Sequence, residues 1–141
     1  MKTHEGLLGT VGLIYGNTNG YYPNKRYGWA QPNVNPIRVD IVGHAWFFKR
    51  EWLTAYWREF PPLGFDIVGE DMHFSYTLQK YFGLNTYVPP HPPTDREMWG
   101  SLKGWEMGTE KNGLSLIPAN IDKMNEYLKI LFSKGFKIVN S

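Results

Sequence analysis

The order of elements between residues 69 and 93 limits the fold of this chain more than any other feature. Residues 70–82 predict an amphipathic helix. Its expected inner face is formed by Phe74, Leu78, Tyr81 and Phe82. Gly83 ends the helical pattern, a short strand is predicted at 86–88, and four prolines follow within residues 89–93. A helix followed closely by a strand indicates a layered α/β structure.

The remaining segments agree with that class. Further strands are predicted, in chain order, at 6–16, at 37–42 with a continuation at 45–48, and at 136–139. Further helices are predicted at 50–60, where Pro61 and Pro62 stop the pattern, and at 118–133, which Pro118 opens. Residues 17–36 predict a long loop rich in turn formers and aromatic rings. We therefore expect an α/β fold with a mixed sheet flanked by helices.

The bulk composition is that of one globular domain over residues 1–141. The apolar fraction of 42% and the charged fraction of 20% are ordinary for such a domain. The net charge of +2 gives no reason to expect a nucleic-acid partner, and no apolar run is long enough to predict a membrane span. The chain has no cysteine, which excludes disulfide and thiolate chemistry. A cytoplasmic location is the default expectation.

Aromatic residues are unusually frequent, with 6 Trp, 9 Tyr and 8 Phe making up 16% of the chain. Rings bring large apolar areas, and Trp and Tyr add a polar group suited to half-wet surfaces. The C–H face of a sugar stacks on such rings, so some of them are candidates for a carbohydrate site. Alternatively, the rings fill the core of a small domain.

Two adjacent acids, Glu70 and Asp71, open the helix predicted at 70–82. One interpretation is structural, because acids in the first turn complement the helix dipole and the free N–H groups. The other is catalytic, since a carboxylate can take the proton from an attacking hydroxyl. Adjacent helical residues point about 100° apart. We therefore expect Asp71 to be the base and Glu70 its supporting neighbour.

His91 and Gly43-His44 are further candidates. His91 stands among four prolines that fix the backbone on both sides, which suits either an ordinary polar residue or a metal ligand. Gly43 could allow a ligand to approach the backbone, or it could mark a β-bulge. His44 and Trp46 alternate on one face of the predicted strand. The segments 99–101 and 108–115, with Trp99 and Trp105 beside them, form a polar loop that closes over a ligand or simply connects two elements.

Segment 39–52, the Gly69-Glu70-Asp71 motif with the helix after it, and the run Tyr87-Val88-Pro89 resemble the second half of GT-A glycosyltransferases. Family 2 enzymes and exostosin-like transferases are the most similar families. The resemblance covers residues 6–116 and depends on the order of short motifs. It implies the acceptor-side half of a nucleotide-diphospho-sugar transferase domain. In those families the acid of this motif acts as base or binds the acceptor, and a later histidine, here His91, can complete a divalent metal site.

The chain departs from that pattern in one respect. GT-A enzymes hold Mn²⁺ or Mg²⁺ with an Asp-x-Asp motif in a preceding nucleotide-binding half, and this sequence contains no Asp-x-Asp. We therefore expect a partial glycosyltransferase domain that lacks most of the donor site by itself, with the nucleotide half absent or supplied by a separate polypeptide. The first strand would then expose an unpaired sheet edge, through which homo-oligomers could form.

Three functions follow from these patterns. The leading one is transfer of a sugar from a nucleotide-diphosphate donor to a hydroxyl of a glycan acceptor. Its expected residues are Asp71 as base, Glu70 as support, His91 as a ligand of Mn²⁺ or Mg²⁺, and Gly43, His44, Trp46, Trp99 and Trp105 as substrate-binding residues. A carbohydrate-binding domain without catalysis is the main alternative. A structural protein whose acids merely complement a helix is the third.

Overall fold

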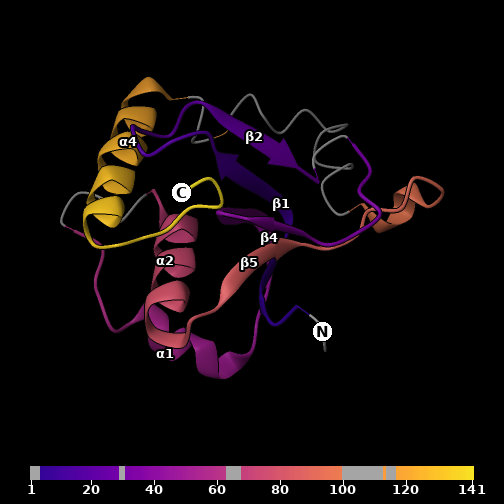
Figure 1. The fold of residues 1–141 in the computed structure, drawn as a ribbon, viewed down its shortest axis with the longest axis horizontal. Coiled ribbons are helices and arrows are strands. Elements are labelled where there is room, and N and C mark those ends of the chain that lie inside the picture. The colour runs from indigo at the N-terminus through magenta and orange to yellow at the C-terminus, as the bar shows by residue number, and fades with distance from the viewer. Residues whose placement is uncertain (1–3, 29–30, 63–67, 100–112, 114–116) are drawn as a thin grey trace.

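The computed structural model describes residues 4–28, 31–62, 68–99, 113 and 117–141. It has an α/β fold with a mixed, curled sheet, as the sequence predicts, and Figure 1 shows its helices gathered on one side. The strands are β1 (Gly6–Tyr15), β2 (Asn24–Tyr27), β3 (Ile37–Val39), β4 (Ile41–Phe47) and β5 (Asn85–Val88). The α-helices are α1 (Leu53–Tyr56), α2 (Glu70–Phe82) and α4 (Pro118–Ser133).

Strand β1 is the centre of the sheet. It pairs with β4 in antiparallel register from Leu8 to Leu13. Leu8 also pairs with Tyr87 of the parallel strand β5, and Leu13 also pairs with Arg26 of the antiparallel strand β2. A strand residue pairs with at most one partner on each side, and Leu8 and Leu13 each have β4 on one side. β2 and β5 therefore share the edge of β1 that lies opposite β4. The expectation that the first strand exposes an unpaired edge is therefore wrong.

The sheet curls because β3 and β4 are nearly continuous but pair with different strands. β3 pairs with β5, and after Asp40 the chain continues directly as β4, which pairs with β1. The carboxylate of Asp40 fixes this corner by accepting hydrogen bonds from Tyr15 N (2.7 Å) and Val139 N (2.6 Å). Gly12 permits the curl, since a Cβ there would lie 2.7 Å from both Val39 and Val88.

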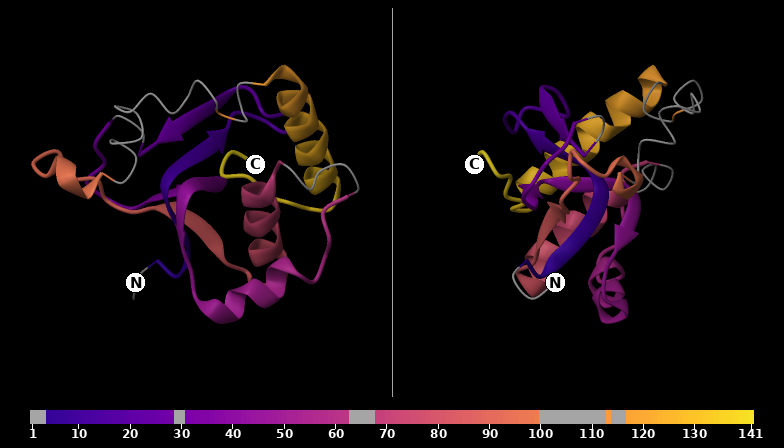
Figure 2. Two further views of the ribbon diagram at one scale, coloured as in Figure 1. Left: turned by 180° about the vertical axis from the view of Figure 1, so that it is seen from behind. Right: turned by 90° about the vertical axis from the view of Figure 1, so that its right-hand side faces the viewer.

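Helix α2 joins the two halves of the core. Met72 and Tyr76 lie in a buried cluster with Leu13 and the apolar residues of α4. Phe74 and Leu78 lie in a second cluster with residues of the sheet and of α1. Figure 2 shows α2 and α4 on one side of the sheet, with the segment after β5 projecting at the far end. Burial on both faces fixes the position of α2, and with it the acids at its start.

Three elements differ from their prediction. β2 forms inside the expected loop 17–36, and the helix expected at 50–60 is a 3-10 turn at Arg50–Trp52 followed by the short α1. Residues 136–139 form no strand, because their backbone groups bond to side chains instead. Gln79 donates to Lys137 O and accepts from Lys137 N, both at 2.8 Å, and Asp40 accepts from Val139 N.

No helix in the described ranges combines the length and the apolar character that a bilayer crossing requires.

Candidate functional site

The start of α2 is shaped by Gly69. Its φ of 94° is left-handed, and a Cβ at this position would lie 2.5 Å from the ring of Tyr127. Only glycine fits such a backbone without strain. His73 N donates to Gly69 O (2.8 Å), which begins the helix, so Glu70 and Asp71 occupy its first turn as the sequence predicts.

The two acids have different surroundings. Glu70 is exposed, whereas Asp71 is half-buried and its Oδ1 accepts a hydrogen bond from Met72 N (2.7 Å). Burial and then the neighbouring charge of Glu70 raise the pKa of Asp71 from 3.8 to about 7, although hydrogen bonds from backbone N–H groups act in the opposite direction. A carboxyl group with this pKa exchanges its proton near neutral pH, which a general acid or base must do.

The rings near Asp71 belong to tyrosines. Burial raises the pKa of Tyr15, of Tyr21 (to about 12) and of Tyr56, and the negative charge of Asp71 adds to all three effects. The hydroxyl of Tyr15 is buried and has no hydrogen-bond partner among the described residues. Tyr21 packs edge-on against Tyr15, with ring centroids 5.8 Å apart. Sequence reasoning missed these residues, because nothing in segment 15–21 indicates that it lies beside residue 71.

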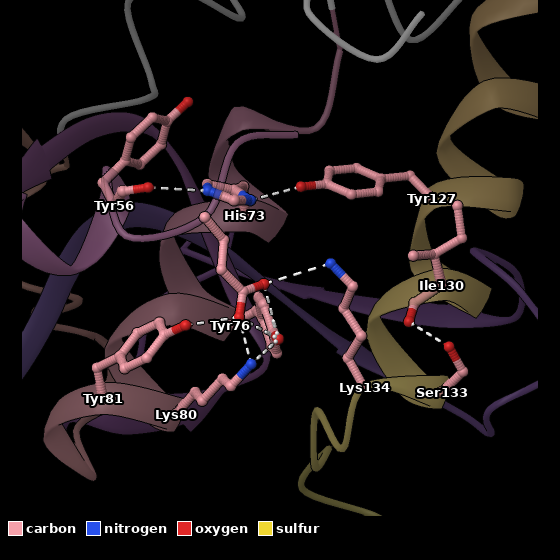
Figure 3. Close-up of polar contacts among 10 residues, drawn as sticks. Tyr56, His73, Tyr76, Lys80, Tyr81, Tyr127, Ile130, Ser133 and Lys134 are labelled. Atoms are coloured by element: carbon pink, nitrogen blue, oxygen red, sulfur yellow. Dashed lines mark hydrogen bonds and ion pairs between the residues drawn. The ribbon is translucent and has the colours of Figure 1, made fainter. Parts of the chain in front are cut away.

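His73 anchors α2 to both neighbouring helices (Figure 3). Its Nε2 lies 3.0 Å from the carbonyl oxygen of Tyr56, and its Nδ1 lies 2.5 Å from the hydroxyl of Tyr127. A carbonyl can only accept, so Nε2 carries the proton and Nδ1 accepts from Tyr127. Burial lowers the pKa of His73, although hydrogen bonds to backbone near Tyr56 and Glu59 and the charge of Glu59 oppose the shift. The neutral ring thus links α1, α2 and α4.

A second anchor is the carboxylate of Glu59, just after α1 (Figure 3). It accepts hydrogen bonds from Tyr76, Tyr81 (2.6 Å), Lys80 and Lys134 (3.3 Å). Burial alone would raise the pKa of Glu59, but the hydrogen bonds from these four side chains outweigh it and lower the pKa to about 2. Together the two anchors hold α2 against its neighbours at His73 and from Tyr76 to Tyr81.

The segment around Gly43 and His44 forms a β-bulge, one of the two alternatives that the sequence leaves open. Gly9 pairs with Trp46 and Val11 with Gly43, so one residue of β1 faces two residues of β4. His44 has a left-handed φ of 66° and an exposed side chain. Non-glycine residues in that conformation are uncommon and concentrate at functional sites. Among the described residues, no atom beyond its two chain neighbours comes within 4 Å of a Cβ built at Gly43.

Trp46 and Trp99 have structural contacts in place of the open ring faces that we expected. The indole N–H of Trp46 donates to Val42 O (3.0 Å) across the bulge, and its ring packs against Phe74. Trp99 is only 7% exposed, and its indole N–H donates to Pro92 O (2.9 Å). The Trp99 ring is therefore largely covered, whereas Trp46 is half-buried. Trp105 lies outside the described residues.

His91 is 1% exposed and lies apart from the two acids. The segment after β5 projects at the opposite end of the sheet from the first turn of α2 (Figure 1). The imidazole of His91 packs edge-on against Trp99, with ring centroids 6.4 Å apart. The structure therefore does not bring His91 into a common hollow with Glu70 and Asp71, as the sequence-based hypothesis expected.

The ring of His91 nevertheless fits one position of a metal site. Nδ1 donates to Pro89 O (2.8 Å), and Nε2 is buried without a partner in the described structure. Metal-bound histidines usually donate their other ring N–H in this way. Asn33 Oδ1 and Thr10 Oγ1 are also buried without a described partner. The backbone of Asn33 pairs with that of His91. Thr10 and His91 both border Gly28. Oxygen donors suit Mg²⁺ and Mn²⁺. No group of three His, Cys, Asp or Glu side chains in the described part could hold a metal ion by itself.

No protein-family model, no curated protein and no solved structure matches this chain.

Proposed function

We propose that this chain is the acceptor-side part of a glycosyltransferase that moves a sugar from a nucleotide-diphosphate donor to a hydroxyl of a glycan acceptor. The observation that carries the proposal is the half-buried carboxyl group of Asp71, whose pKa burial and Glu70 raise to about 7. Such a group is a weak acid matched to neutral pH, and it lies in a helix start that Gly69 and His73 hold in place. The sequence motifs around it supply the choice of reaction.

In the proposed reaction Asp71 is the general base. The acceptor oxygen attacks the anomeric carbon of the donor sugar and forms the new C–O bond. The bond from that carbon to the diphosphate breaks, and its electron pair leaves with the nucleoside diphosphate. The proton of the acceptor hydroxyl passes to Asp71, which must be ionised beforehand. The rate should therefore rise with pH through the pKa of this carboxyl.

Glu70 and His44 have supporting roles in this proposal. Glu70 is exposed beside Asp71 and contributes to the raised pKa of that group through its charge. His44, on the surface of the β4 bulge, is the candidate for acceptor contact, because a bulge turns a side chain away from the regular pleat. The two residues can be tested separately, since neither is part of the buried core.

A divalent cation, if bound, would supply charge neutralisation for the departing diphosphate. Within the described residues His91 would be one ligand through Nε2, with Asn33 and Thr10 as candidate oxygen donors. The other ligands would come from the donor diphosphate or from a separate nucleotide-binding polypeptide. Because His91 lies away from Asp71, we assign no step of the reaction to this position.

The test is a transfer assay with a panel of UDP- and GDP-sugars, Mn²⁺ and glycan acceptors, with wild-type protein and the Asp71→Asn variant. We expect the variant to lose about 10²- to 10⁴-fold in rate while it still binds the acceptor. Asp122→Asn, which removes an exposed carboxylate on α4, is the matched control and should leave the rate unchanged. Full activity of Asp71→Asn would disprove the role of this residue. The absence of donor binding by the wild type, measured as a thermal shift, would favour a domain that only binds carbohydrate or an incomplete transferase.

A carbohydrate-binding domain without catalysis is the second candidate, and two exposed rings favour it. Trp57 and Phe60 are 62% and 76% exposed, and their centroids lie 6.4 Å apart. Exposed aromatic rings are suited to stacking on a sugar face. On this reading Trp57→Ala weakens glycan binding in calorimetry, whereas Asp71→Asn changes nothing. Loss of sugar transfer by Asp71→Asn, with glycan binding unchanged in Trp57→Ala, supports the transferase instead.

A further inference from the structure

A polar hollow lies between α2, the first residues of β5 and the C-terminal segment 136–139. It has an empty volume of about 200 Å³, including space continuous with solvent. Its lining includes Ser75 and Gln79 of α2, Asp40, Thr86, and the cationic residues Arg38 and Lys137. We call it the Ser75 hollow. It belongs neither to the start of α2 nor to the region of His91.

Three polar side chains that line the hollow, Gln79, Asp40 and Thr86, already have partners. Both ends of the Gln79 amide bond to the backbone of Lys137 at 2.8 Å. The two Asp40 oxygens accept from backbone N–H groups of Tyr15 and Val139, and the Thr86 hydroxyl donates to Val39 O (2.6 Å). These bonds use much of the hydrogen-bonding capacity of the three side chains.

The buried hydroxyl of Ser75 differs from these three groups. Its residue is 2% exposed, and Oγ has no hydrogen-bond partner among the described residues. A serine within a helix can bond to a carbonyl of the preceding turn, as Thr77 of the same helix does with Phe74 O (3.2 Å). Ser75 makes no such bond in this structure. A buried hydroxyl without a partner loses its hydration and gains nothing in return.

We propose that the Ser75 hollow is the binding site of one ordered water molecule, held by the hydroxyl of Ser75. The lining of the hollow is largely polar, as a hydrated site requires. A water molecule can donate to Ser75 and accept from it. It can also bridge to the C-terminal segment, which Gln79 and Asp40 already fix beside α2.

The charges around the hollow favour a neutral occupant. Arg38 and Lys137 oppose a cation, and the buried carboxylate of Asp40 opposes an anion. Burial raises the pKa of Asp40, against hydrogen bonds from Tyr15 and Val139 and the charge of Arg38, which lower it. Water meets the need for a small ligand that both donates and accepts without a net charge.

The direct test is NMR of the full chain, with magnetisation transfer from water to the amide protons of Ser75 and Thr86. A long-lived water should give cross-peaks at these amides in the wild type, and Ser75→Ala should lose them while the rest of the amide spectrum is retained. Thr77→Ala is the matched control, since its hydroxyl bonds within the helix, and it should keep the cross-peaks. Absence of cross-peaks in the wild type overturns the proposal, whether or not either variant folds.

The stability of Ser75→Ala gives a second, independent readout. If the hydroxyl holds a water molecule, its removal should raise the unfolding equilibrium constant by about 2- to 10-fold, as the loss of a typical hydrogen bond does. If the hydroxyl has no partner, its removal should lower that constant instead, which would overturn the proposal. The remaining possible occupant is an anion, which titration with chloride and phosphate tests. A saturable chemical-shift change of the Ser75 amide would identify an anion and refute the water site.

Discussion

Asp71→Asn should make the protein more stable above neutral pH. The carboxyl group of Asp71 has a pKa of about 7 in the folded chain, against an ordinary value of 3.8. Between these two values the folded state keeps a proton that the unfolded state releases. The stability of the wild type therefore falls as pH rises from about 4 to 7, and above pH 7 the whole cost of an ionised, half-buried carboxylate is present. Asparagine has no charge, and its side-chain oxygen can still accept the bond from Met72 N.

The size of the effect follows from the two pKa values. A difference of about 3 between the folded and unfolded states, at about 1.4 kcal/mol for each pH unit, corresponds to roughly 4 kcal/mol. Asp71 keeps some contact with solvent, which reduces this cost. We expect the variant to gain about 2–4 kcal/mol at pH 8 and close to nothing at pH 4.

Urea unfolding followed by tryptophan fluorescence at pH 4 and pH 8 measures this difference. The informative quantity is the change with pH of the gap between variant and wild type, because other groups titrate equally in both proteins. Asp122→Asn should shift the free energy of unfolding by no more than about 0.5 kcal/mol at either pH. A gap for Asp71→Asn that is the same at both pH values, or a less stable variant at pH 8, would refute the reasoning.

Two further predictions concern the supports of α2. Gly69→Ala should lower the free energy of unfolding by about 2–5 kcal/mol, since a Cβ on this left-handed backbone would lie 2.5 Å from the Tyr127 ring. Gly83→Ala, the matched control, should lower it by only about 1–2 kcal/mol, because the surroundings of Gly83 are open. Equal shifts of the two denaturation midpoints would contradict this assignment. Glu59→Gln should cost about 1–3 kcal/mol at pH 7 by removing a charged acceptor of four hydrogen bonds. Since the pKa of Glu59 is lowered to about 2, its contribution is present above pH 4.5 and is lost as pH falls towards 2. Thermal melts from pH 2 to pH 7 should show this slope in the wild type and not in the variant.

Elements with strong local signals could be predicted from the sequence. Helix α2 runs from Glu70 to Phe82 as expected, and its end at Gly83 has the left-handed φ of 64° that a glycine stop implies. Helix α4 begins at Pro118 and ends at Ser133, in agreement with the helical spacing and the proline signal. In these segments the backbone conformation depends mainly on nearby residues.

Elements that depend on distant partners could not be predicted in this way. β2 is a polar segment of four residues with no alternating pattern, and pairing with β1 defines it. Residues 136–139 have the alternation of a strand, but Gln79 and Asp40 provide the hydrogen bonds that a neighbouring strand would supply. The local sequence pattern does not indicate when a side chain supplies these hydrogen bonds in place of a strand.

The candidate site also has features that the sequence predicts and features that depend on tertiary packing. That Glu70 and Asp71 open a helix follows from the sequence. That only Asp71 is half-buried, and that Tyr15 and Tyr21 lie near it, depends on how β1 and α4 pack. The common hollow expected for Asp71 and His91 did not form, because the described neighbours of His91 are Gly28, Asn33 and Trp99 and not the start of α2.

The central place of β1 has a consequence for how this chain reaches its fold. Leu13 pairs with Arg26 close by in the chain, but Gly6 pairs with Asn85, so the parallel half of the sheet requires a very long loop to close. Contacts of such separation slow folding, because chain entropy is lost before the pairing is gained. The β1–β2 hairpin can assemble early, whereas the first residues of β1, Gly6 to Leu8, leave the same edge unpaired until β5 is synthesised and docked. Until then that edge is open to other chains, so the interval before β5 docks is the period of greatest exposure to aggregation.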